Sequence, residues 1–192
     1  MKRLIVAITG ASGAIYGVRA LEMLRDVGVE THLILTVAGI RTINAELDLG
    51  VDAVRALADH THNPKDIGAS ISSGSYVTDG MLVAPCSIKS LSGIAHCYND
   101  ELVVRAADVC LKERRRVVLL LRETPFHLGH IELMAQATRN GAIVMPPVPA
   151  FYHRPATIDD IVNQTVARAL DLFGVSVQAI RRWNGRASIG AA

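Results

Sequence analysis

Two short segments of small and hydroxyl-bearing residues each follow an apolar run in this sequence. Residues 10–13 (GASG) come directly after the run 4–8, and residues 87–90 (SIKS) come soon after the run 81–84. A glycine turn between a strand and a helix presents unpaired backbone N–H groups to an anion, and small side chains let the anion approach closely. The first segment is therefore predicted to hold a phosphate, and the serines of the second to add hydroxyl groups around the same ligand.

Reactive side chains follow other apolar runs in the same way. Thr36 closes one run, Arg122 and Glu123 follow another, and Tyr152 lies in a proline-rich segment after a third. A carboxylate beside a cation can orient it and take up a proton when a phosphate departs. Ligands of parallel α/β sheets bind outside the carboxyl ends of the strands, so these segments are expected to converge on one site.

The elements that must position these residues alternate along the chain. Short runs rich in branched apolar residues are typical of buried strands, and apolar residues at helical spacing indicate helices. Strands are predicted over residues 4–8, 31–36, 81–84, 117–121 and 142–145. Helices are predicted over 15–27, 37–45, 51–58, 100–113, 126–140 and 158–173, with a further helix opening at the SIKS segment and a long loop over 60–76. This order predicts an α/β fold with a doubly wound, mostly parallel sheet in three layers, Rossmann-like or flavodoxin-like.

Bulk composition excludes several classes of protein. The chain has 192 residues with a formal net charge of +2, and half of them are apolar. This length predicts a single domain, taken as residues 1–185, with a disordered tail over 186–192. The near-neutral charge argues against nucleic acid as a partner. Three cysteines without CxxC spacing argue against a disulfide framework or a zinc site, and no aliphatic run is long enough for a membrane span, so a cytoplasmic protein is expected.

Several ligands can be compared with the first turn. Its glycines do not follow GxGxxG, and Thr36 stands where a nicotinamide cofactor's ribose usually meets an acidic residue. The phosphate loop GxxxxGK[ST] is also absent from the sequence. Flavin mononucleotide (FMN) needs one phosphate pocket with hydroxyl and amide groups around its ring, which Ser12, Thr36, Ser87 and Ser90 can supply.

Long motifs in the chain resemble those of the UbiX/Pad1 family of flavin prenyltransferases. The resemblance runs from about residue 2 to Trp183 and rests on the segments GASGAIYGVR, SGSYVTDGMLVAPCSIKSLSGIA, RAADVCLKERR, LRETPFHLGHIELM and MPPVPAFYHRPATIDDIVNQTVARALD. It implies that a dimethylallyl group passes from dimethylallyl monophosphate to N5 and then C6 of reduced FMN, without a metal. The product would be prenylated FMN for a partner decarboxylase of the UbiD type, in ubiquinone biosynthesis or aromatic acid decarboxylation.

The resemblance also assigns roles to individual residues. It implies that FMN is contacted by Gly10, Ala11, Ser12, Thr36, Ser87, Ile88, Lys89, Ser90 and Arg105. It implies that the prenyl donor is bound by Tyr76, Lys112, Arg122, Glu123, Tyr152 and Arg168. The catalytic residues it implies are Ser12, Glu46, Lys112 and Glu123. Family members form dodecamers with sites at subunit interfaces, so a homo-oligomer is expected here.

Two other functions are compatible with parts of the sequence. A flavin-dependent cysteine decarboxylase of the LanD-like class would share the fold and FMN, but it carries a PASANT-like segment where this chain has APCSIKS. An accessory subunit of a hydroxyarene decarboxylase would hold FMN without catalysis and would not need the cations. His127, His130 and His153 lack a carboxylate or cysteine that completes a ligand set, so no metal site is predicted.

Overall fold

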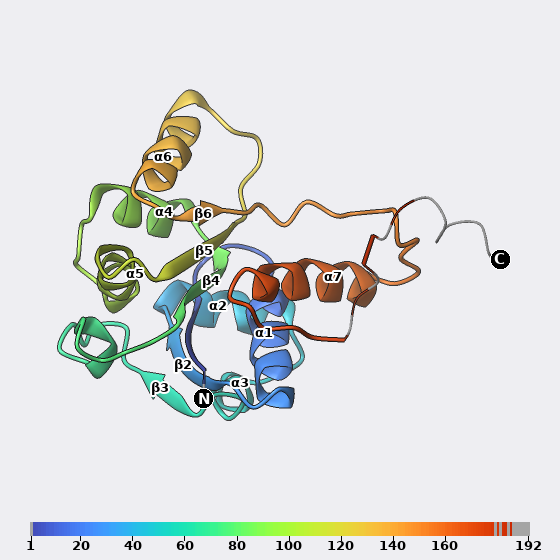
Figure 1. The fold of residues 1–192 in the computed structure, drawn as a ribbon, viewed down its shortest axis with the longest axis horizontal. Helices are drawn as coiled ribbons and strands as arrows, with labels where there is room; N and C mark the ends of the chain where they lie inside the picture. Colours follow the sequence, from blue (N-terminus) through green and yellow to red (C-terminus); the bar gives the residue numbers. More distant parts are fainter. Residues whose placement is uncertain (1, 179, 181, 184, 186–192) are drawn as a thin grey trace.

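A six-stranded, all-parallel sheet forms the centre of this computed structural model, which describes residues 2–178, 180, 182, 183 and 185. The strand order is β3-β2-β1-β4-β5-β6 (Figure 1). The strands are β1 (Arg3–Ile8), β2 (Glu30–Leu35), β3 (His60–His62), β4 (Gly80–Cys86), β5 (Arg116–Leu121) and β6 (Ile143–Val144). The chain first builds outward from β1 to β3 and then crosses to β4 on the other side of β1. This reversal puts a topological switch point between β1 and β4, where α/β proteins bind ligands.

Helices cover both faces of the sheet, as the sequence predicts. One face packs against α1 (Ala14–Asp26), α2 (Val37–Glu46), α3 (Val51–Arg55) and α7 (Ile158–Asp171). The other face packs against α4 (Ile88–His96), α5 (Leu102–Lys112), α6 (Leu128–Arg139) and the short 3-10 helix η1 (Ser70–Ser72). Alternate residues of β1 enter the two cores, because successive side chains of a strand point to opposite faces. The expected three-layer α/β fold is confirmed.

The expected loop over residues 60–76 contains two regular elements. β3 pairs with β2 in parallel, and η1 follows eight residues later in the chain. The sequence of β3 is His-Thr-His, which has no apolar alternation that would reveal a strand. Its position at the edge of the sheet explains this, because an edge strand needs backbone pairing on one side only.

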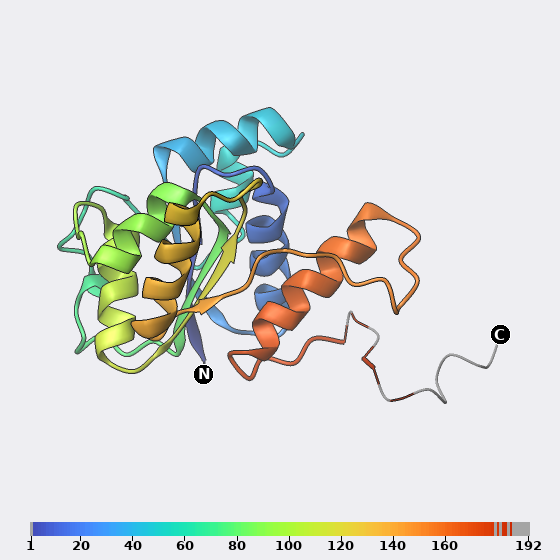
Figure 2. The same cartoon turned by 90° about the horizontal axis from the view of Figure 1, so that it is seen from above.

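The last helix lies at the end of a long irregular segment. Residues 145–157 leave β6 and run outward past the side of the sheet before α7 returns to pack on α1 (Figure 2). Thr157 and Asp160 form the capping box that the sequence predicts at the start of α7. The predicted disordered tail, residues 186–192, lies outside the described residues.

Candidate functional site

The turns after β1 and β4 are tied together at the switch point. The Thr9 hydroxyl donates to the carbonyl of Pro85 at 2.8 Å and accepts from the backbone N–H of Ser87 at 2.9 Å. Thr9 is buried, so these bonds are shielded from water. The two segments that the sequence singles out are therefore held side by side at the carboxyl edge of the sheet.

Backbone geometry explains the two glycines of the first turn. Gly13 has a φ of 100° and immediately precedes α1, a conformation that residues with a Cβ rarely adopt. A Cβ on Gly10 would lie 2.3 Å from the Cβ of Ala38 at the start of α2. The turn is therefore compact because both positions lack a side chain, and it leaves Gly10 and Ser12 exposed on its outer side.

Glu46, the last residue of α2, places its carboxylate at the start of α1. Its Oε2 accepts from the backbone N–H groups of Gly13 at 2.8 Å and Ala14 at 3.0 Å. Burial would raise the pKa of Glu46, but hydrogen bonds from the Ser12 hydroxyl and these two N–H groups, together with the charge of Arg122, bring it below its ordinary value. Glu46 is therefore ionised at neutral pH.

This contact changes one expectation. The sequence suggested that the N–H groups at the start of α1 are free to bind a phosphate, whereas those of Gly13 and Ala14 already bind the Glu46 carboxylate. A carboxylate at a helix N-terminus is stabilised by the same dipole that attracts a phosphate. A ligand phosphate must therefore use other donors or displace Glu46.

A second helix start at this edge offers hydroxyl groups. The Ser87 side chain caps α4 by accepting from the N–H of Ser90 at 3.3 Å, and the two hydroxyls lie 3.1 Å apart. Ile88 is half-buried, while Lys89 is exposed and pairs with Glu101 at 2.6 Å. The serine side of α4 therefore faces the switch point, and Lys89 is held by a neighbouring helix.

Residues after β2 and β5 complete this edge. Thr36 caps α2 by accepting from the N–H of Gly39 at 3.0 Å. The backbone N–H of Arg122 donates to the carbonyl of Cys86, which holds Arg122 beside the end of β4. The positive charge of its guanidinium lowers the pKa of Glu46. We call the following residues the carboxyl-edge site: Gly10, Ala11, Ser12, Thr36, Glu46, Ser87, Ile88, Lys89, Ser90, Arg122 and Glu123.

Known proteins match most of this chain. A family model described as "Flavoprotein" matches residues 1–170. The flavin prenyltransferase UbiX of Escherichia coli K12 is 60% identical over 188 residues, which cover 96% of this chain and 100% of that protein. This chain belongs to the UbiX family.

Solved structures of the UbiX family share the fold closely. AnUbiX (PadA1), solved in complex with FMN and dimethylallyl pyrophosphate, matches with a TM-score of 0.95 and 48% identity, covering 96% of this chain and 98% of that one. A dodecameric FMN-dependent UbiX-like decarboxylase from Escherichia coli O157:H7 matches with a TM-score of 0.93 and 51% identity, covering 95% and 100%.

Three of the residues that the UbiX resemblance assigns lie away from the carboxyl-edge site. The Tyr76 ring packs under the guanidinium of Arg3, at 4.6 Å from the ring centroid, near the amino end of β1. Lys112 ends α5, next to Glu113 with which it pairs, just before β5 begins. Since β5 has six residues, about 20 Å of strand separates Lys112 from Arg122. Arg105 donates to the carbonyl of Ser72 at 3.2 Å and to Asp108 at 2.9 Å.

Of the last two assigned residues, Tyr152 lies beside α7 and Arg168 lies on it. The Tyr152 hydroxyl accepts from Gln164 at 2.8 Å, and its ring meets Trp183 edge to face at 5.8 Å. Arg168 pairs with Asp171, which also takes two hydrogen bonds from Arg182. Hydrogen bonding to Arg182 holds the pKa of Asp171 below its usual range. Within one chain, the proline-rich segment therefore does not join the other strand ends. The sequence pattern predicted that it would.

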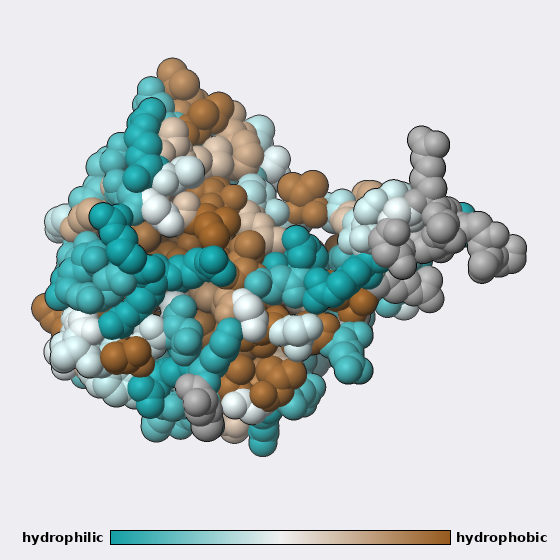
Figure 3. Space-filling model, in the orientation of Figure 1, coloured by the Kyte–Doolittle hydropathy of each residue, from teal (hydrophilic) through white to brown (hydrophobic). Residues whose placement is uncertain are grey.

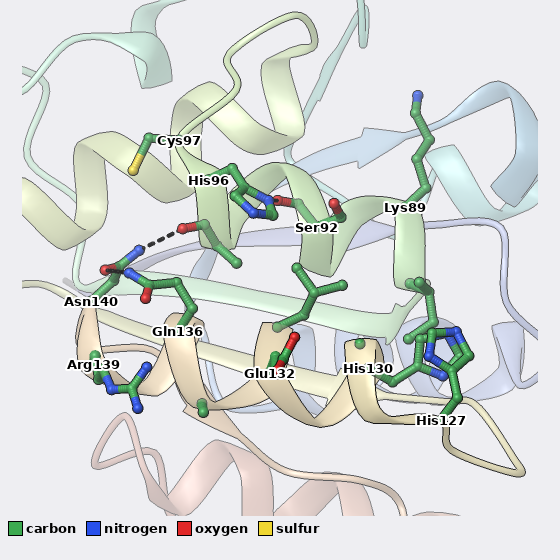
Figure 4. A pocket seen from close by; sticks show the side chains of 15 residues that line it. Lys89, Ser92, His96, Cys97, His127, His130, Glu132, Gln136, Arg139 and Asn140 are labelled. Atoms are coloured by element: carbon green, nitrogen blue, oxygen red, sulfur yellow. Dashed lines mark hydrogen bonds between the residues drawn. The ribbon is translucent and has the colours of Figure 1, made fainter.

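A large groove adjoins the carboxyl-edge site between α4 and α6. Its volume is about 1110 Å³, and its lining includes Ile88 and Lys89 at one end and Cys97 and Asn140 at the other. Figure 4 shows His127 and His130 together near the Lys89 end, where their ring centroids lie 3.6 Å apart. The sequence reveals these histidines only as one face of a helix, because the facing helix is distant in the chain.

Apolar side chains gather over the middle of one face of the molecule, bordered by hydrophilic ones (Figure 3). Large apolar side chains that are exposed in the single chain include Phe126, Leu128, Ile131, Val148, Phe151 and Ile158. Most lie on α6 or on the irregular segment before α7. Exposed apolar residues at this density are typical of surfaces that another protein covers. Among the described residues, no helix is both long enough and apolar enough to cross a membrane.

Proposed function

We propose that this protein is a flavin prenyltransferase, which joins the dimethylallyl group of dimethylallyl monophosphate to N5 and C6 of reduced FMN. The observation that carries the proposal is the ionised Glu46, held beside Ser12 and Arg122 at the switch point of a chain 60% identical to a UbiX prenyltransferase. A carboxylate fixed there has the charge state needed to accept a proton from the flavin ring.

The carboxyl-edge site fits a flavin mononucleotide. The first turn exposes Gly10 and Ser12 on its outer side, and Ser87 and Ser90 bring two hydroxyls to the start of a nine-residue helix. Backbone N–H groups at a helix start bind phosphate well, and Glu46 already occupies those of Gly13 and Ala14 at the start of α1. The start of α4 is therefore the better place for the FMN phosphate. When bound, reduced FMN would supply the nucleophilic ring atoms that take the prenyl group.

Binding of the prenyl donor needs more cations than one carboxyl-edge site contains. Arg122 and Glu123 lie there, whereas Lys112, Tyr152 and Arg168 lie elsewhere on the same chain. We propose that neighbouring subunits supply these three groups, together with Arg105 and Tyr76. Charged and phenolic hydrogen-bond donors around the phosphate would stabilise it as a leaving group.

One property of the chain and one of a related protein support this assembly. The apolar side chains around α6 and the irregular segment 145–157 are exposed in a single chain, and a related structure is dodecameric. A homododecamer would bury the apolar surface and bring Lys112 of one subunit toward Arg122 of another. We therefore propose the same oligomer, in the cytoplasm, with a UbiD-type decarboxylase as the protein that receives the product.

An anaerobic single-turnover experiment tests the function. The holoprotein is reduced with dithionite, dimethylallyl monophosphate is added, and the flavin released on denaturation is weighed by mass spectrometry. The proposal predicts FMN heavier by one C5 unit. The same assay with dimethylallyl pyrophosphate asks whether this chain also uses the compound named with AnUbiX.

The assay also separates the two other functions. Bound but unmodified FMN with either donor would contradict the prenyltransferase and favour an accessory subunit that only holds flavin. Oxidative decarboxylation of a C-terminal cysteine peptide, with no prenylated flavin, would favour the LanD-like class. A protein that binds no FMN would contradict the assignment of the carboxyl-edge site itself.

A further inference from the structure

Three histidines and a glutamate gather at the outer edge of the sheet. Glu30 and His32 lie on β2, and His60 and His62 lie on the edge strand β3, where His32 pairs directly with His60. Residues two apart on a strand share a face, so all four side chains meet on one side of this edge. His32 and Thr36 are four residues apart, which puts the cluster about 13 Å from the carboxyl-edge site.

The ligand atoms of three of these residues converge. Glu30 Oε1 lies 3.2 Å from His32 Nε2 and 3.5 Å from His60 Nε2, and the three ligand atoms all lie within 4.8 Å of one another. Tetrahedral zinc with bonds of about 2.0–2.1 Å requires ligand atoms about 3.3 Å apart. The two distances to the carboxylate are already close to this value, and the two imidazole nitrogens lie no more than 4.8 Å apart.

The stacked rings need only a small adjustment to aim at one ion. His32 and His60 have ring centroids 4.7 Å apart and planes inclined by 24°. His32 is 2% exposed and fixed, whereas the side chain of His60 is 53% exposed and free to turn toward the ion. Entry from solvent is therefore open on the His60 side.

A second set of contacts orients the buried histidine. His32 Nδ1 lies 2.9 Å from Nε2 of His62, so its Nδ1–H can donate there while Nε2 keeps its lone pair for a metal. Ligating histidines in metalloproteins usually bind a partner through the other ring nitrogen in this way. A water can take the fourth position on the metal, beside the Tyr76 hydroxyl, which lies 3.2 Å from His32 Nε2.

The charges around the cluster favour a cation despite one nearby arginine. Arg3 Nε binds Glu30 Oε1 at 2.8 Å and offsets that carboxylate. Two further carboxylates act on histidines of the cluster, Asp59 on His60 and Asp66 on His62, and Asp79 acts on Arg3. The surroundings are thus net negative, which compensates part of the charge of a divalent ion.

We propose that Glu30, His32 and His60 form a zinc-type metal site at the β2–β3 edge, separate from the flavin and its chemistry. Two imidazoles and one carboxylate suit Zn²⁺ and its spectroscopic substitute Co²⁺ rather than Mg²⁺ or Ca²⁺, which prefer oxygen ligands. The ion would clamp the short edge strand to β2.

The test is a Co²⁺ and Zn²⁺ titration of the full-length holoprotein, made without an affinity tag and stripped with a chelator. We expect one Co²⁺ per chain with the visible absorption of a tetrahedral ion, displaced by Zn²⁺. His60→Gln and Glu30→Gln change partly exposed groups and should each weaken binding at least tenfold. His96→Gln is the matched control, because this histidine is exposed and, among the described residues, hydrogen-bonds the carbonyl of Ser92 in its own helix.

The outcomes are distinct from those of the prenylation assay. Failure to bind stoichiometric Co²⁺, or equal binding by wild type and His60→Gln, would overturn the metal site. Prenylation should persist in the chelator-stripped protein, since none of the three proposed ligands belongs to the carboxyl-edge site or to the residues assigned to the prenyl donor. Circular dichroism at equal concentration identifies a ligand variant that fails to fold. The other ligand variant then replaces it in the test.

Discussion

Replacing Glu46 by glutamine separates its two roles. The glutamine amide oxygen can still accept from Gly13 and Ala14, so the change removes the negative charge and keeps the hydrogen-bond geometry. The lost interaction is that of a carboxylate with a helix N-terminus, about 0.3–1 kcal/mol. Because Glu46 is exposed, we expect a loss near the lower end, about 0.5 kcal/mol in the free energy of unfolding.

The expected effect on catalysis is much larger. Loss of a general base costs about 10²–10⁴ in rate, equivalent to about 2.7–5.5 kcal/mol in activation free energy. The assay is the anaerobic single turnover, followed by flavin mass at timed quenches, with urea unfolding of the same preparation. Glu46→Gln should keep FMN bound and fold normally while forming the heavier flavin at least a hundredfold more slowly. Asp48→Asn, two residues away and exposed, is the matched control.

The pH dependence gives a second check of the same residue. The pKa of Glu46 is lowered from an ordinary value of 4.5, so the folded protein keeps the ionised form into acid. Its contribution to stability is present above 4.5 and is lost as the pH falls through the lowered pKa. The stability difference between wild type and Glu46→Gln should therefore vanish in strong acid.

A prenylation rate of Glu46→Gln within threefold of wild type, or complete loss of FMN from this variant, would refute the role assigned to Glu46.

Three further predictions concern the divided site and the first turn. Tyr152→Phe and Arg168→Ala should each weaken the prenyl donor by about 1–3 kcal/mol, measured as the donor concentration for half-maximal rate, and an unchanged value in both would remove them from the site. Co-expression of Lys112→Ala chains with Glu46→Gln chains should restore about a quarter of wild-type activity. In randomly mixed oligomers, about a quarter of the sites that two subunits share combine an intact Glu46 with an intact Lys112. If each site lay within one chain, no activity would return. Gly10→Ala should lower the free energy of unfolding by about 1–3 kcal/mol and reduce FMN binding, because the new Cβ would meet the start of α2. A urea unfolding curve equal to that of wild type would contradict this.

The sequence by itself determined most of the fold. The run at β1 and the helical spacing of α1 are local patterns, and the structure keeps both with ends shifted by at most one residue. The capping box at Thr157 is likewise read from residues three apart. The strand β3 was missed, since its pattern of histidines carries no apolar signal and its pairing with β2 depends on residues about thirty positions away.

The candidate site was only partly within reach of the sequence. The turn residues Gly10–Ser12 and Ser87–Ser90 follow strands, so their convergence at one edge follows from parallel topology. The resemblance named Glu46 as catalytic, but nothing local indicated that its carboxylate would take the N–H groups of Gly13 and Ala14. That contact joins the end of one helix to the start of another, thirty-three residues earlier for Gly13.

Only the tertiary structure decided how the reactive groups are divided in space. Lys112 and Arg122 are ten residues apart, yet a strand between them carries the chain from one end of the sheet to the other. The cluster of Glu30, His32 and His60 shows the opposite case, in which distant residues meet because two strands pair in one register. Sequence patterns report local conformation, whereas proximity depends on strand order, register and helix packing, which the whole chain sets together.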